Sequence, residues 1–194
     1  LHPVAHSFPT RRSSDLHKPE ILAPAGDTDS FLAAISAGAD SIYCGLKHFS
    51  ARMQAENFSV PELARLARLG REYGCKTSIA FNSLVKPHEL EQAGRLLDRI
   101  TQTVQPEVII VQDLALVNLA RQVGYSGQIH LSTLAAMSSA KALPLLQDMG
   151  LSRIVLPREL SIDEIKKLAM SCPPGMELET FVHGALCYAV SGHC

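Results

Sequence analysis

The sequence predicts an α/β fold, a (β/α)8 TIM-like barrel that is interrupted after about seven strands. Short apolar runs alternate with segments of helical spacing seven times along the chain. The connections between them are short, which favours parallel strands joined by right-handed crossovers. One glycine, Gly26, follows the first apolar run, instead of the glycine-rich phosphate-binding pattern of a doubly wound open sheet. The doubly wound sheet is therefore the alternative, and the barrel is favoured.

The expected elements can be placed by their start and stop signals. Asp27 and Ser59 precede helical segments as N-cap residues, and Gly38 and Gly74 end them. Ser161 begins a capping box three residues before a glutamate. Strands are expected at residues 21–25, 41–45, 75–82, 108–112, 129–132, 153–157 and 178–184. Helices are expected up to residue 37 and at residues 59–74, 88–103, 114–123 and 138–149, and a further one from residue 161.

The domain organisation is expected to be a single partial barrel over residues 18–194. Residues 6–16, HSFPTRRSSDL, resemble the translation of a common sequencing-library adapter, so residues 1–17 are expected to be non-native. A disordered basic tail is the alternative for this segment. Because the chain also lacks an initiator methionine, we expect a fragment whose first and seventh strands lack a partner, and which is unstable and inactive alone.

Composition limits the partners and the compartment. The chain has 194 residues, 46% of them hydrophobic, and a net charge of −1, so nothing in the totals demands a nucleic-acid or membrane partner. No apolar run approaches the length of about 20 residues that a membrane helix needs. Five cysteines, an odd number, indicate reduced thiols and a cytoplasmic setting. RNA binding by a local basic rim stays open.

Polar residues at the predicted strand ends form the candidate site, because barrel chemistry gathers at the carboxyl ends of the strands. A long loop after the second strand is expected to cover this end with polar side chains. The planar guanidinium of Arg158 suits a carboxylate or a phosphate. The catalytic candidates are His183, Arg158, Glu159, Arg52 and Asn82. The substrate-binding candidates are Arg52, Asn57, Asn82, Gln112, Ser132 and Arg158.

Structural interpretations stand beside the functional ones. Asp113 is expected to cap the following helix rather than to act in catalysis. Glu159 either pairs with Arg158 or belongs to the site. His130 shares an inward face with Ser132, and as a residue of a buried strand it is more often a satisfied core histidine than a base.

Two cysteines, Cys187 and Cys194, follow the seventh predicted strand and are separated by six residues. Thiolates in such a loop bind metals or iron–sulfur clusters, but two are too few to hold either. Cys44, Cys75 and Cys172 are interpreted as buried or incidental thiols.

Several motifs, in order, resemble the collagenase-like peptidase family, family 32 of the peptidases of unknown type. They are ILAPAG at residues 21–26, AGAD at 37–40, FSAR at 49–52, NF at 57–58, VQD at 111–113, RELS at 158–161 and FVHGALC at 181–187. The resemblance covers residues 19–194. It implies a relationship to proteins that hydroxylate a tRNA or rRNA base with prephenate, or a quinone precursor, without oxygen.

By this resemblance Cys187 and Cys194 are expected to be two ligands of a four-iron, four-sulfur (4Fe-4S) cluster, with the other two ligands outside this sequence. The leading hypothesis is an iron–sulfur protein for hydroxylation of an RNA base or a quinone precursor, with prephenate as a co-substrate. A peptidase is the alternative, and a non-catalytic accessory subunit is the second alternative. A homo- or hetero-oligomer is compatible with each hypothesis.

Overall fold

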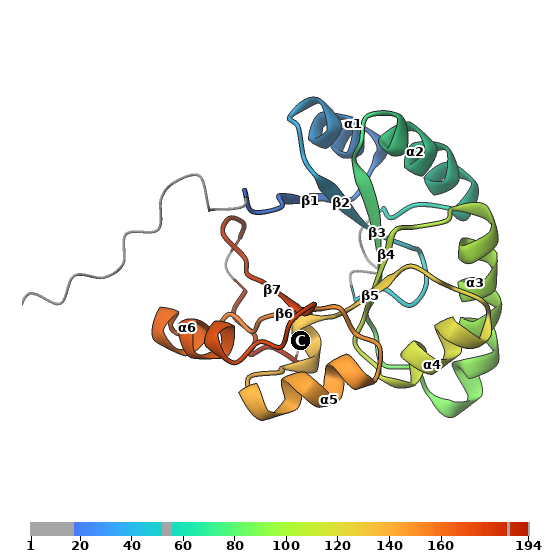
Figure 1. Ribbon diagram of the computed structural model, residues 1–194. Coiled ribbons are helices and arrows are strands. Elements are labelled where there is room, and N and C mark those ends of the chain that lie inside the picture. The colour runs from blue at the N-terminus through green and yellow to red at the C-terminus, as the bar shows by residue number, and fades with distance from the viewer. Residues whose placement is uncertain (1–17, 52–55, 186, 194) are drawn as a thin grey trace, which may run out of the picture.

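The computed structural model describes residues 18–51, 56–185 and 187–193, which form a curved sheet of seven parallel strands with helices on its outer face (Figure 1). Each strand is hydrogen-bonded to the next one in the chain. The strands are Leu22–Ala25 (β1), Ser41–Gly45 (β2), Lys76–Phe81 (β3), Val108–Val111 (β4), Gln128–Leu131 (β5), Arg153–Val155 (β6) and Glu177–Glu179 (β7). The helices are Thr28–Ser36 (α1), Val60–Glu72 (α2), Leu90–Thr103 (α3), Ala115–Gln122 (α4), Leu143–Asp148 (α5) and Ile162–Met170 (α6). Sequential strand order with the helices on one face confirms the barrel-type fold over the doubly wound alternative.

The core lies between the sheet and the helices. In β3 the side chains of Ile79 and Phe81 are fully buried in this core. The alternate residue Ser78 faces the inside of the curve, where its hydroxyl lies 3.1 Å from that of Ser41 on β2. The two faces of the sheet therefore differ: the outer face is apolar, and the inner face carries polar groups. In the part of the chain that the structure describes, no helix is long and apolar enough to cross a membrane.

Two helices begin with capping boxes, one at the predicted N-cap Ser59 and one at the capping box predicted from Ser161. The Ser59 hydroxyl accepts a hydrogen bond from the Glu62 backbone N–H, and the Glu62 carboxylate accepts one from the Ser59 N–H. Ser161 and Glu164 repeat this exchange at the start of α6. Each cap satisfies backbone N–H groups that have no partner within the helix, which stabilises the helix by about 1 kcal/mol.

Two helices begin later than predicted, and in α5 a proline explains the difference. The sequence predicts a helix over residues 138–149, but α5 begins at Leu143, with Pro144 in its first turn. The predicted helix over residues 88–103 likewise starts as the 3₁₀ turn Pro87–Glu89 before α3. Because proline lacks an N–H and fixes φ, it fits only the first turn of a regular helix.

The last strand is much shorter than its prediction. The sequence predicts a strand over residues 178–184, whereas β7 ends at Glu179. Its partner β6 has three residues, and the pairing ends where the Leu156 N–H donates to the Glu179 carbonyl, 2.8 Å away. Beyond this point Phe181 and Val182 are exposed, by 53% and 94%. The prediction was wrong here, and His183 lies in a bend beyond the strand rather than at its end.

Arg153, at the start of β6, joins the two ends of the sheet. Its Nε donates to Glu177 on β7 at 2.8 Å, and its Nη1 lies 3.4 Å from the Glu179 carboxylate. It also donates to Glu20, which precedes β1 and which accepts from Lys76 at 3.2 Å. The Arg153 side chain is 11% exposed. The sheet therefore curves far enough that charged groups from its two ends meet at the amino-terminal ends of the strands.

Candidate functional site

The predicted site residues of the middle strands lie at one edge of the sheet. Asn82 follows β3, Gln112 follows β4, Ser132 follows β5, and Arg158 and Glu159 follow β6. Because the strands are parallel, their carboxyl ends share this edge, which we call the C-terminal edge. Active sites of (β/α)8 barrels are built there.

The loop after β2 is anchored to β3 by an aromatic pair and by Asn82. Phe49 stacks on Phe81, with ring centroids 5.1 Å apart and planes 9° from parallel. The Ala51 backbone N–H donates to the Asn82 Oδ1 at 3.1 Å. Arg52 lies outside the described residues, but Asn82 holds the residue directly before it. The structure therefore gives Asn82 a role in positioning this loop over the C-terminal edge.

Asn57 closes the same loop against β2. It adopts the left-handed conformation with φ of 49°, and it is 8% exposed. A Cβ on Gly45 would lie 2.3 Å from the Asn57 Oδ1 and 2.9 Å from the Ser50 Oγ, so only glycine leaves room for these side chains. The following N–H, that of Phe58, donates to the Gly45 carbonyl at 3.1 Å. The amide of Asn57 is thus directed onto the end of β2.

Gln112 and Ser132 hold the turn that follows β5. The Gln112 Nε2 donates to the Leu134 carbonyl at 3.2 Å, and the Ser132 Oγ accepts from the Leu134 N–H at 3.2 Å. Asp113 accepts from the Ala115 N–H at 3.0 Å and from the Val85 N–H at 3.3 Å, but the N-cap of α4 is Leu114, so Asp113 holds the backbone before the helix instead of capping it as predicted. These contacts fix the two candidate substrate-binding side chains along one stretch of the C-terminal edge.

Arg158 and Glu159 hold the segment that carries the cysteines. The Glu159 Oε1 accepts from the Ser191 N–H at 2.7 Å, and the Arg158 Nη2 donates to the Ala189 carbonyl at 3.2 Å. The Ser191 hydrogen bond holds the pKa of Glu159 below its ordinary value. Ser191 is 2% exposed, and its Oγ lies 3.5 Å from the Thr133 Oγ1. Sequence reasoning missed Ser191, although the Ser-Gly pair at 191–192 is a turn signal.

A small cavity of about 140 Å³ opens beside Arg158 at the C-terminal edge. Apolar side chains make up most of its wall, and Arg158 supplies a positive charge. The lining residues are Leu156, Pro157, Arg158, Leu160, Ile165, Thr180 and Phe181. An apolar wall with one guanidinium suits a small anion that has an apolar body.

Cys187 and His183 lie on the exposed segment that leaves β7 at the C-terminal edge. Cys194 lies outside the described residues. A thiolate is a fitting donor for an iron–sulfur cluster, so the chemistry of the pair is suitable. Among the described residues no three His, Cys, Asp or Glu side chains form a group that could hold a metal ion. Two thiolates alone could supply at most half of a four-thiolate set.

The three remaining cysteines do not complete this set. Cys44 is fully buried on the outer face of β2, and burial raises its pKa. Cys75 and Cys172 precede β3 and β7, so they lie at the opposite end of the strands from Cys187. Burial raises the pKa of both thiols. Their places agree with the interpretation of these cysteines as incidental.

His130 is buried inside the curve, as its alternation with the core residues Ile129 and Leu131 predicts. It is 2% exposed, and neither ring nitrogen has a hydrogen-bond partner. Burial, together with the nearby charge of Arg153, lowers its pKa to about 3. His130 is therefore neutral near pH 7, but it is not the satisfied core histidine that the sequence indicates.

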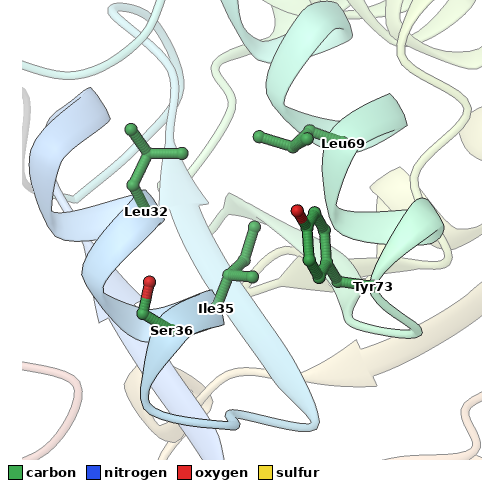
Figure 2. Close-up of a pocket in the computed structure, with 5 residues that line it drawn as sticks. All are labelled: Leu32, Ile35, Ser36, Leu69 and Tyr73. Carbon is green, nitrogen blue, oxygen red and sulfur yellow. The ribbon is translucent and has the colours of Figure 1, made fainter.

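A second groove, of about 340 Å³, lies away from the C-terminal edge (Figure 2). Figure 2 shows Leu32, Ile35 and Ser36 on α1 facing Leu69 and Tyr73 of α2 and its C-cap. Ser36 ends α1, and helices of this fold run antiparallel to the strands. This groove therefore lies on the outer face, toward the amino-terminal ends of the strands, and is separate from the candidate site.

A family model of peptidase family U32 matches residues 26–194, which include the C-terminal edge and the Cys187 segment. The chain belongs to peptidase family U32. The resemblance that the motifs indicate is thereby confirmed, and three curated relatives show what this U32 chain is similar to.

The chain is 33% identical to tRNA hydroxylation protein P1 of Bacillus subtilis over 91% of its own length and 41% of that protein. It is 35% identical to 23S rRNA 5-hydroxycytidine C2501 synthase of Escherichia coli, over 92% of the chain and 26% of that protein. It is 34% identical to a collagenase of Porphyromonas gingivalis, over 90% of the chain and 44% of that protein. The chain thus spans less than half the length of these relatives.

Solved structures confirm the fold. The U32 peptidase Mk0906 superposes with a TM-score of 0.70 at 15% identity, covering 92% of this chain and 72% of that one. Oxaloacetate acetylhydrolase superposes with a TM-score of 0.59 at 13% identity, covering 81% of this chain and 65% of that one. At these identities the likeness concerns the arrangement of strands and helices and not the chemistry.

Proposed function

We propose that this chain is the barrel region of a cytoplasmic protein that hydroxylates an RNA base without molecular oxygen. The similarity to tRNA and rRNA hydroxylation proteins over about nine-tenths of the chain carries this proposal. The polar C-terminal edge, with Arg158, Asn57 and Asn82 around it, gives such a reaction a place in the fold. A quinone precursor is the alternative substrate of the same chemistry.

The proposal includes a 4Fe-4S cluster with Cys187 and Cys194 as two of its ligands. Thiolate chemistry and the exposed place of Cys187 at the C-terminal edge support this role. The other two ligands would come from outside this sequence, because Cys44, Cys75 and Cys172 lie elsewhere in the fold. An iron–sulfur cluster held there would supply electron transfer. Hydroxylation without molecular oxygen is a two-electron oxidation, so it would also need an external electron acceptor and an oxygen atom from another donor such as water.

Prephenate, the co-substrate suggested by the family resemblance, is a small dicarboxylate. The cavity beside Arg158 has the apolar wall and the single guanidinium that such an anion would use. We include prephenate binding in the proposal on this basis, with Arg158 as the residue that would meet a carboxylate.

Peptidase activity is the second candidate function, because a collagenase is among the relatives. Ser132 and His130, which share the inner face of the sheet, give no support to a serine-type mechanism. The Ser132 hydroxyl is engaged with the Leu134 N–H, and the ring nitrogens of His130 have no hydrogen-bond partner. Ser132 and His130 therefore do not form a nucleophile and base pair.

Mass spectrometry of nucleosides from a strain that lacks the gene tests the main proposal. We expect one hydroxylated nucleoside of tRNA or rRNA to disappear and to return when the gene is restored. An unchanged set of nucleosides would refute RNA as the substrate. Iron and sulfide analysis of the anaerobically purified full-length protein tests the cluster separately. Gelatin cleavage that follows the protein through purification and is lost on a point substitution would favour the peptidase.

A further inference from the structure

The segment from residue 187 to residue 193 has no helix or strand, yet part of it is held firmly. Tyr188 is fully exposed, whereas Ser191 is 2% exposed. The segment therefore meets the barrel at Ser191 and its neighbours. What holds these residues decides how the cysteine segment lies on the C-terminal edge.

Two adjacent side chains after β6 form hydrogen bonds to the backbone of this segment. The Glu159 carboxylate accepts from the Ser191 N–H at 2.7 Å, and the Arg158 guanidinium donates to the Ala189 carbonyl at 3.2 Å. The guanidinium thus binds a backbone carbonyl, and the carboxylate binds a backbone N–H two residues further on. Hydrogen bonds to charged groups are stronger than those between neutral groups.

Further contacts at Ser191 and Gly192 hold the segment close to the ends of the strands. The Thr133 Oγ1 donates to the Leu156 carbonyl at 3.2 Å and lies 3.5 Å from the Ser191 Oγ. A Cβ on Gly192 would lie 3.1 Å from the Leu134 carbonyl oxygen, which the Gln112 side chain already holds. The segment is therefore fitted against the ends of β4, β5 and β6.

The held residues form a tight turn between the two cysteines. The His193 N–H donates to the Val190 carbonyl at 2.9 Å, and Gly192 has φ of 88°, as the third position of a type II turn requires. A turn between two cysteines brings them closer in space than an extended segment would, which suits two ligands of one metal centre.

We propose that Arg158 and Glu159 are positioning residues that fix the turn at 190–193 and thereby set the place of the Cys187 segment on the C-terminal edge. The role of these residues in fixing the turn does not depend on the proposed cluster. Only the expected effect on the retention of iron rests on the proposed function. In this role the two side chains act through the backbone at Ala189 and Ser191, which is separate from the contact with a carboxylate proposed for Arg158.

Hydrogen exchange of the full-length protein, read by mass spectrometry on peptides covering residues 187–193, tests the proposal. Glu159→Ala removes the acceptor of the Ser191 N–H, so we expect exchange there to be about tenfold faster or more. Glu159→Gln keeps an amide oxygen in the same place and should restore most of the protection. Glu91→Ala, which removes an exposed carboxylate on α3, is the matched control and should leave this exchange unchanged. Equal exchange in wild type and Glu159→Ala would overturn the proposal.

Iron content after anaerobic reconstitution separates this inference from the proposed function. If wild type binds iron, Glu159→Ala should lose it about tenfold faster to a chelator, with Glu159→Gln close to wild type. Equal loss from both would overturn the positioning of a ligand. If wild type binds no iron, the cluster proposal fails, and the exchange experiment alone decides whether Glu159 holds the turn.

Discussion

Replacing Arg153 by methionine should destabilise the protein far more than replacing an exposed arginine. Met keeps much of the apolar length of the side chain and removes the guanidinium that faces Glu20, Glu177 and Glu179. The Glu20 and Glu179 side chains are 21% and 18% exposed, so their charges would stay largely buried without this partner. Removing one member of a buried ion pair costs about 3–5 kcal/mol.

The lower end of that range applies to Arg153→Met, because Lys76 still pairs with Glu20 and because Glu177 is 60% exposed. We therefore expect the free energy of unfolding to fall by about 3 kcal/mol, which lowers the Tm of a chain of this length by roughly 6–12 °C. Urea denaturation followed by far-UV circular dichroism measures the first quantity.

Arg95→Met is the matched control, since Arg95 pairs with Glu91 on the surface of α3, where the two side chains are 66% and 83% exposed. An exposed pair of this kind is worth about 0.3 kcal/mol. Equal losses in the two variants would refute the argument that burial makes the Arg153 cluster important.

The pH dependence gives a second check on Arg153→Met. Burial alone would raise the pKa of Glu20, but its bonds to Arg153 and Lys76 hold that pKa below the ordinary 4.5. The wild-type pair therefore contributes stability above pH 4.5 and loses it as the pH falls through the lowered pKa. In Arg153→Met the buried carboxylates accept protons more readily, so the difference from wild type should shrink as the pH falls below 5 or so.

Three further changes test the packing, the interior and a helix cap. Gly45→Ala should cost about 1–3 kcal/mol in urea denaturation, because its Cβ would overlap Asn57, whereas Gly26→Ala, with no atom within 4 Å, should change little. His130 has a pKa of about 3 against an ordinary 6.5, so the unfolded state takes up this proton first as the pH falls. The free energy of unfolding of the wild type should therefore fall by up to roughly 5 kcal/mol between pH 6.5 and pH 3, and His130→Leu should reduce this dependence on pH. Ser161→Ala removes the cap of α6 and should lower stability by about 1 kcal/mol, with no change in the iron retained.

Local rules predicted much of the fold. The seven strands follow from periodicity, the N-cap at Ser59 from its residue type, and the capping box at Ser161 from a glutamate three positions later. Pro144 favours the first turn of a helix, so its position already indicated that α5 begins near residue 143, but the prediction placed the start at residue 138. The end of β7 depends on how many residues of β6 are available to pair, which is a property of the neighbouring strand.

The sequence predicts where the candidate site lies in the fold, but it does not predict which groups its side chains contact. Parallel strands bring Asn82, Gln112 and Ser132 to one edge whatever their side chains do. The hydrogen bond of Glu159 to the Ser191 N–H joins residues 32 positions apart through a backbone group that every residue but proline has. No residue type signals such a partner. The Glu20 and Arg153 pair, 133 positions apart, was hidden for the same reason.

The sequential order of the strands has a consequence for synthesis on the ribosome. Each strand hydrogen-bonds to the strand made just before it, so a new unit finds its template already in place as the chain emerges. The sheet can thus grow one unit at a time, with short loops to close at every step. The ion pair of Glu20 with Arg153 is the exception, because its first member is made long before its second. Until β6 arrives, the growing sheet has no charged contact to hold its two ends together there, and it is free to adjust its curvature.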